Sequence, residues 1–255
     1  MIKVWAIAQN TFREAVRDKI LYSLLFFALV MIGSSVLIAE LTIGEYGKII
    51  RDVGLASISI FGLLIAIFVG IGLIYKEIER KTIYTIASKP VPRWQFLVGK
   101  YLGLLATLAT EVAIMTVAYF AVLQAMGVGV TGAMVPAIWL TFVELAVVTA
   151  IAILFGSFTS PVLSALFTIG LTLIGKISQE LMIIGERSES EGVRMLLAGA
   201  YRVLPDLARF DLRGPASYGT SVEWEYVAYA TGYGAAYAAA LLVLASLIFR
   251  FRDFK

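Results

Sequence analysis

Two glutamates, Glu111 and Glu144, lie inside apolar runs that are long enough to cross a membrane. An ionised carboxylate near the centre of a bilayer costs about 2.5–3.5 kcal/mol on insertion scales, so such residues often mark a pathway. Because no Lys or Arg is predicted at their depth, we expect a neutral carboxyl, a hydrogen bond to a threonine, or exposure to a wet cavity. Two roles of these glutamates remain as alternatives: a structural hydrogen bond between helices, or part of a pathway for a substrate or a proton. The nearby threonines are Thr107, Thr110, Thr141 and Thr149.

A charged, proline-broken segment, residues 75–103, separates two other apolar runs. It reads YKEIERKTIYTIASKPVPRWQFLVGKYLG. Residues 81–88 suffice for two helical turns that present Ile83 and Ile86 on one side. Pro90 then stops the helix, because proline lacks the backbone N–H and biases the residue before it to extended geometry. A short rigid helix of this kind is suited to receive a push from a cytoplasmic partner; the alternative is an ordinary basic inner loop.

The composition indicates a polytopic membrane protein. Of the 255 residues, 60% are hydrophobic and 15% charged, against about 45–50% and about 25% in soluble domains. Since about 20 apolar residues span a bilayer, the sequence predicts six transmembrane helices. The fifth is the weakest, because Lys176 and Glu180 interrupt it, and its outer third is expected to be interfacial or re-entrant. The predicted spans are Leu21–Ala39, Leu55–Tyr75, Phe96–Met126, Val135–Phe158, Pro161 to about Ile184, and Ala228–Phe249.

The distribution of basic residues sets the orientation of these spans. Most of the 21 Lys and Arg residues precede the first span, lie between the second and third, or follow the last. Such residues are retained in the cytoplasm, which places both termini and residues 76–95 there and makes 178–224 a long outer loop. Residues 1–20 carry Glu14 and Asp18 and no cleavage site, so they are not a signal peptide. We expect them to form an amphipathic helix in the inner interface.

The chain contains no cysteine and no histidine. This excludes a disulfide, a Cys- or His-ligated zinc, a Cys nucleophile and a Ser-His-Asp triad. Residues 170–177 match the first seven positions of the phosphate-binding G-x-x-x-x-G-K-[ST] loop. However, Ile177 stands where the magnesium-binding hydroxyl is needed, and the stretch lies inside an apolar span. We therefore predict no enzymatic activity, no metal site and no nucleic-acid partner for this chain.

A stripe of tyrosines follows one side of the last span. Its members are Tyr229, Tyr233 and Tyr237. An aromatic stripe is more typical of packing or of an interface belt than of a ligand site. We expect these side chains to have a packing role.

Three stretches of the sequence carry a family resemblance. They are NTFREAVRDKILY at 10–22, EIERKTIYTIASKPVPRWQFLVGKYLG at 77–103 and FGSFTSPVLSALF at 155–167. The most specific part is the pattern E-x-x-x-x-T-I-x-x-I-x-S-x-P-V-x-R from Glu77 to Arg93, followed by Gly99 and Lys100. Together they resemble the ABC-2 type permease family, the membrane subunits of type-2 ABC transporters. Within it, the chain is most similar to the permease of the nitrous-oxide-reductase copper-maturation system.

The resemblance implies one all-α permease domain over residues 1–255, in the cell (inner) membrane, with an amphipathic first helix and six spans. It also implies a dimer with a second permease copy or paralogue, driven by a separate cytoplasmic ABC ATPase. That partner would bind ATP and Mg, so no cofactor is expected in this chain. Residues 82–88 would be the coupling helix that docks on the ATPase. The residues expected to make this contact are Glu77, Glu79, Arg80, Thr82, Ile83, Ile86, Ser88, Lys89 and Arg93.

The expected function is therefore a permease that couples ATP hydrolysis by its partner to export or to mechanical signalling. One alternative is a proton-coupled secondary transporter that uses Glu111 and Glu144. Another is a non-transporting module that relays the ATPase strokes to a periplasmic or extracellular protein bound at 178–224. Without Cys or His, only scattered methionines could bind soft copper, so copper is not assigned as the substrate.

Overall fold

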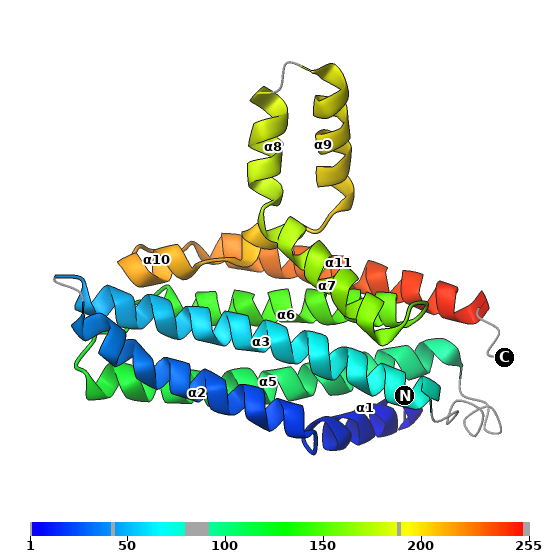
Figure 1. Ribbon diagram of the computed structural model, residues 1–255, viewed down its shortest axis with the longest axis horizontal. Helices are drawn as coiled ribbons and strands as arrows, with labels where there is room; N and C mark the ends of the chain where they lie inside the picture. Colours follow the sequence, from blue (N-terminus) through cyan, green and yellow to red (C-terminus); the bar gives the residue numbers. More distant parts are fainter. Residues whose placement is uncertain (1, 42–43, 80–91, 188–189, 252–255) are drawn as a thin grey trace.

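The structure of the chain is a computed structural model that describes residues 2–41, 44–79, 92–187 and 190–251 (Figure 1). Within these ranges every regular element is a helix. The elements in chain order are α1 (Ile2–Ala15), α2 (Lys19–Glu40), α3 (Tyr46–Glu79), α5 (Arg93–Ala125), α6 (Met134–Gly156), α7 (Pro161–Lys176), α8 (Ser178–Arg187), α9 (Glu191–Val203), the short 3₁₀ helix η1 (Leu207–Phe210), α10 (Arg213–Tyr218) and α11 (Trp224–Phe251).

Five of the described helices are individually long and apolar enough to cross a membrane, namely α2, α3, α5, α6 and α11. The helices α7 and α8 satisfy the same condition only as a pair, and they meet at a bend of 58°. Counted as one broken span, the pair brings the number to six. The all-helical polytopic fold is thus confirmed. The predicted weakness of the fifth span corresponds to this break, which falls between Lys176 and Ser178.

The helix α6 lies at the centre of the bundle. It packs against α3, α5, α7 and α11, and 72% of its most apolar window is buried, against 22% in both α2 and α11. The outer helices leave large apolar side chains exposed, among them Phe26, Leu37 and Val243. In a bilayer such a surface faces lipid or another transmembrane helix. The window of α3 is 67% buried, so the burial pattern separates two interior helices, α6 and α3, from helices that form the periphery.

The helix α7 turns its small polar residues inward and its apolar residues outward. Ser164, Thr168 and Thr172 recur every fourth residue and are buried, while Leu166 and Phe167 are exposed. Thr168 and Thr172 donate to the carbonyls one helical turn earlier, at 2.7 Å in both cases. These two hydroxyls satisfy their hydrogen bonds within the helix, and the Ser164 hydroxyl donates to the Ala152 carbonyl of α6 at 3.4 Å, so the small inward face has its polar groups satisfied. It can therefore pack closely against the bundle.

The helix α1 packs parallel to the first turns of α5. A Cβ atom added to Gly99 would lie 2.7 Å from the Ile7 Cβ, and one added to Gly103 would lie 2.5 Å from the Ala8 carbonyl oxygen. Two glycines separated by three residues allow such close approach of helix backbones. The structure therefore shows α1 attached to α5. Its predicted position in the inner interface of the membrane stays a prediction.

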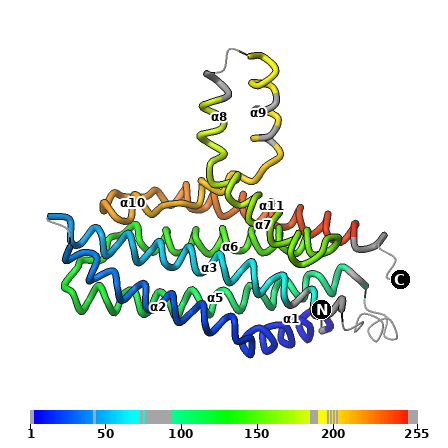
Figure 2. Tube along the Cα trace, viewed as in Figure 1, coloured from blue at the N-terminus to red at the C-terminus, as the bar shows by residue number. Residues whose placement is uncertain are grey.

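The helices α8 and α9 lie side by side and stand off from the bundle (Figures 1 and 2). They follow the bend after α7, and the chain returns from α9 to the bundle through Pro205 and η1. Leu207 and Phe210 of η1 are fully buried against the bundle. Part of the segment predicted to be a long outer loop is therefore packed among the helices.

Candidate functional site

The helices that flank the predicted coupling segment end close together. The helix α3 continues to Glu79 and α5 begins at Arg93. Glu77 and Glu79 thus lie in the last turns of α3, and Arg93 is the first residue of α5. Figure 1 places these helix ends at the same end of the bundle as the start of α1 and the end of α11. The remaining predicted contact residues lie outside the described ranges; they are Arg80, Thr82, Ile83, Ile86, Ser88 and Lys89.

A buried lysine connects this end of α5 to α1. Lys100 is 1% exposed, and its ammonium lies 3.7 Å from the Glu14 carboxylate. The same ammonium lies 5.9 Å from the centroid of the Phe96 ring. Sequence reasoning placed Lys100 among the basic residues of the inner loop and gave Glu14 no partner. The Gly99-x-x-x-Gly103 spacing was the available signal, because it predicts a helix packed closely on this face of α5.

Glu144 forms an ion pair in the interior of the bundle. Its Oε1 lies 2.6 Å from the Lys176 Nζ. The expectation that no basic residue lies at this depth is therefore wrong for Glu144. The reason is the bend after α7: Lys176 is the last residue of a short helix that ends beside the middle of α6. A straight fifth span would have carried the chain past this level.

Glu111 has a different environment. Its side chain is only 3% exposed, and its Oε2 has no hydrogen-bond partner among the described residues. The expected threonine partners are wrong, because these hydroxyls donate within their own helices. Thr107 donates to the Gly103 carbonyl at 3.0 Å, and Thr110 to that of Ala106 at 2.9 Å. Thr141 and Thr149 do the same in α6, at 2.9 and 2.7 Å. The two membrane glutamates are thus not equivalent.

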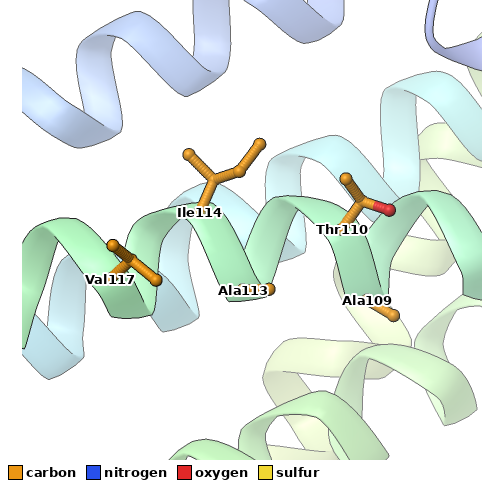
Figure 3. Close-up of a pocket in the computed structure, with 5 residues that line it drawn as sticks. All are labelled: Ala109, Thr110, Ala113, Ile114 and Val117. Carbon is orange, nitrogen blue, oxygen red and sulfur yellow. The ribbon is translucent and has the colours of Figure 1, made fainter.

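A shallow pocket of about 590 Å³ lies along the exposed side of α5 (Figure 3). Its lining residues are Ala109, Thr110, Ala113, Ile114 and Val117. The lining contains no ionisable side chain, and its one hydroxyl already donates within α5. Neither Glu111 nor Glu144 belongs to this lining. The pocket therefore presents an apolar surface and no side chain that could act as an acid or a base.

A polar cluster that sequence reasoning missed surrounds Asp206, which is 3% exposed. Its Oδ1 accepts hydrogen bonds from the Ser178 hydroxyl at 3.0 Å and the Gln179 amide at 3.4 Å. Its Oδ2 accepts from the Tyr201 hydroxyl at 3.3 Å and from the Arg209 Nε at 3.0 Å. One buried carboxylate thereby joins α8, α9 and η1. Loop residues have no periodic pattern, so the sequence did not reveal this grouping.

The tyrosines of α11 hold this segment against the bundle, which confirms their predicted packing role. Tyr233 accepts the backbone N–H of Asp206 at 2.9 Å, and Tyr237 donates to the Val203 carbonyl at 2.8 Å. The Arg209 guanidinium lies 5.6 Å from the ring centroid of Tyr229 and 5.0 Å from that of Tyr233. These contacts attach the start of η1 beside the middle of α11.

A second acid–base pair follows in the outer segment. Arg213 donates to Asp211 through its backbone N–H at 3.0 Å and its Nε at 2.9 Å. Burial favours the neutral carboxyl, but the hydrogen bonds from Arg213 prevail and hold the pKa of Asp211 below its usual value. The same hydrogen bonds raise the pKa of Arg213. Both groups therefore stay ionised at neutral pH.

The bundle, its broken span and its buried charges define an all-helical polytopic membrane protein. The model of the ABC-2 family transporter proteins matches residues 5–249. The chain therefore belongs to this family, which consists of membrane permeases and not of catalytic subunits. Membership implies association with the membrane and with a cytoplasmic ABC ATPase. No curated protein matches the chain.

Proposed function

We propose that this chain is the permease subunit through which a separate cytoplasmic ATPase drives export, or mechanical signalling, across the inner membrane. The observation that carries the proposal is the joint position of three helix ends. The end of α3, the start of α5 and the start of α1 lie at one end of the bundle (Figure 1), and the contact of Lys100 with Glu14 joins α5 to the last turn of α1. A force applied to residues 80–91 would reach α3 and α5 directly and α1 through Lys100.

The proposal extends to topology and partners. Both termini would be cytoplasmic, since the start of α1 and the end of α11 lie at the same end of the bundle as the helix ends next to the coupling segment (Figure 1). A second permease copy or paralogue would complete the transporter, and ATP and Mg would be bound by the ATPase. Copper is left out of the proposal, because the chain has neither Cys nor His and soft copper favours such ligands and clustered methionines.

Arg93→Glu is expected to abolish recovery of the ATPase. Charge reversal at the first residue of α5 would oppose docking, because like charges across an interface are strongly unfavourable. The measurement is affinity purification from native membranes in mild detergent, with mass spectrometry of the co-purifying proteins. The matched control is Arg194→Glu, a reversal on α9 at a side chain that is 58% exposed, which should recover as much ATPase as the parent chain. No ATPase in any of the three samples would refute the proposal.

Glu111 gives a reason to keep proton-coupled transport as a second candidate. A buried carboxyl oxygen without a partner is the kind of group that can take up and release a proton inside a membrane. Glu144 is less suited to this role, because its Oε1 is paired with the Lys176 ammonium at 2.6 Å. The non-transporting relay would share the features of the ATP-driven permease and differs from it only in lacking substrate flux.

Glu111→Gln is the variant that separates these functions. Glutamine keeps the shape of the side chain and removes the titrating proton, so a permease driven by ATP alone should retain at least half of the parent activity. A proton-coupled transporter should lose nearly all of it. The measurement is substrate flux in proteoliposomes, with and without a pH gradient and with and without ATP on the ATPase side. Full flux without nucleotide in the parent chain would favour the proton-driven function.

A further inference from the structure

The break between α7 and α8 has no proline to explain it. Pro161 is the only proline in residues 161–187, and it stands in the first turn of α7, where proline is compatible with a helix. Sharp kinks otherwise arise at Gly/Ser pairs or where another group inserts. Gly175 lies just before the break, and a Cβ atom there would be 2.7 Å from the Pro205 carbonyl oxygen. The returning chain thus packs directly into the bend.

Two polar anchors bracket the break at Ile177. On the α7 side, Lys176 contacts Glu144 of α6 at 2.6 Å. On the α8 side, Ser178 donates to Asp206 at 3.0 Å, and Gln179 donates to both of its carboxylate oxygens at 3.4 Å. These contacts hold consecutive parts of the chain in different directions. The first attaches α7 to the centre of the bundle, and the second directs α8 toward η1.

Asp206 is itself fixed to the bundle. Its backbone N–H is bound by Tyr233 of α11, and Arg209 holds its Oδ2 at 3.0 Å. A buried carboxylate needs this many donors, because desolvation of an unpaired charge costs several kcal/mol. A chain in which α8 continued the line of α7 would withdraw the donors of Ser178 and Gln179 and leave the Asp206 carboxylate with Arg209 and Tyr201 alone. The bent arrangement is therefore favoured by the electrostatics of one side chain.

The remaining attachments of the α8–α9 pair are few. The helix α8 packs against α9 and makes small contacts with α7 and η1, and the pair stands off from the bundle (Figure 2). Ile183 of α8 and Met195 of α9 are 50% and 69% exposed. The hydrogen bonds of Asp206 thus carry a large share of what sets the direction of α8.

We propose that Asp206 is the positioning residue of the broken α7–α8 span, and that it holds α8 and α9 at their angle to the bundle. The Glu144–Lys176 ion pair fixes the opposite side of the same bend. The span then has two conformations. When the Asp206 contacts open, α8 changes direction while α7 stays in place. This inference concerns the chain alone and does not depend on an ATPase or on a substrate.

The test is a distance measurement between spin labels in lipid nanodiscs. The parent chain has no cysteine, so two introduced cysteines carry the only labels. One pair reports the bend, at Ile183 of α8 and Val243 of α11, which are 50% and 60% exposed. A second pair reports the bundle, at Val243 and at Ile60 of α3, which is 52% exposed. Asp206→Ala is expected to replace a single narrow distance in the first pair with a broad or shifted one, and to leave the second pair unchanged.

The matched control is Glu191→Ala, which removes another acid of the same pair of helices. The Glu191 side chain is 75% exposed and lies 3.8 Å from Arg194 of α9, so its removal should leave both distances as in the parent. If Asp206→Ala does not fold, Ser178→Ala combined with Gln179→Leu removes the same anchor from α8 and should give the same broadening. A parental Ile183–Val243 distance in Asp206→Ala, or in the double variant, would overturn the proposal. Equal broadening in Glu191→Ala would do the same.

Discussion

Glu144→Gln is expected to destabilise the folded bundle by about 3 kcal/mol. Removal of one partner from a buried ion pair costs about 3–5 kcal/mol, because the other charge is left without compensation. The side chain of Lys176 is 26% exposed and that of Glu144 only 4%, so partial hydration of the lysine places the effect at the lower end. Lys176→Met added to Glu144→Gln should recover most of the loss, since the double variant buries no unpaired charge. The measurement is a double-mutant cycle on the free energy of unfolding in detergent micelles.

An exposed ion pair supplies the control for this cycle. The Lys48 ammonium lies 3.7 Å from the carboxylate of Glu45, three residues earlier and directly before the start of α3, and the Glu45 side chain is 60% exposed. Glu45→Gln should therefore change stability by less than about 1 kcal/mol, as surface pairs usually do. If Glu144→Gln cost no more than Glu45→Gln, the Glu144–Lys176 contact would not be a significant interaction. If Lys176→Met failed to rescue Glu144→Gln, the loss would have to come from packing.

The sequence predicted correctly those helices whose position is set by the length of an apolar run alone. The first and fourth predicted spans differ from α2 and α6 by a few residues at each end. The second span was predicted from Leu55, whereas α3 begins at Tyr46. Its first turns carry Arg51 and Asp52, which the apolar pattern excluded. The structure places these side chains against α10, where Arg51 donates to the Ser217 carbonyl at 3.3 Å and Ser217 to Asp52 at 3.3 Å. Such tertiary partners cannot be seen in a pattern of hydropathy.

The sites were predicted less completely than the spans, for two physical reasons. Counting depth at about 1.5 Å per residue assumes straight spans, and the bend after Lys176 breaks that assumption. The partner of Glu144 was therefore missed although Lys176 had been recognised as unusual. Asp206 was missed because its donors come from α8, α9 and η1, elements that meet only in the folded chain. The tyrosine stripe of α11 was recognised, but the segment that it holds was not.

Gly103→Leu is expected to release α1 from α5 and to uncouple the permease from its ATPase. The added Cβ would lie 2.5 Å from the Ala8 carbonyl oxygen and 2.5 Å from the Thr11 Cβ. The first of these is a backbone atom, so no rotation of a side chain relieves the clash and the two helices must separate. Overpacking costs about 1–3 kcal/mol. This cost raises the equilibrium constant for local opening of α1 by roughly 5- to 150-fold. The measurement is amide hydrogen exchange of residues 2–15 in nanodiscs.

Gly170→Leu is the matched control, because nothing lies within 4 Å of a Cβ atom at that position of α7. It introduces the same side chain into a transmembrane helix and should leave exchange in α1 unchanged. The functional consequence follows from Lys100, whose contact with Glu14 requires α1 to stay on α5. In Gly103→Leu the ATPase should still co-purify through the coupling segment, while stimulation of ATP hydrolysis by the permease falls. If hydrogen exchange in α1 of Gly103→Leu were as slow as in the parent chain, α1 would be held by other contacts. If α1 were released but ATP hydrolysis were still stimulated as in the parent, α1 would have no part in the coupling mechanism.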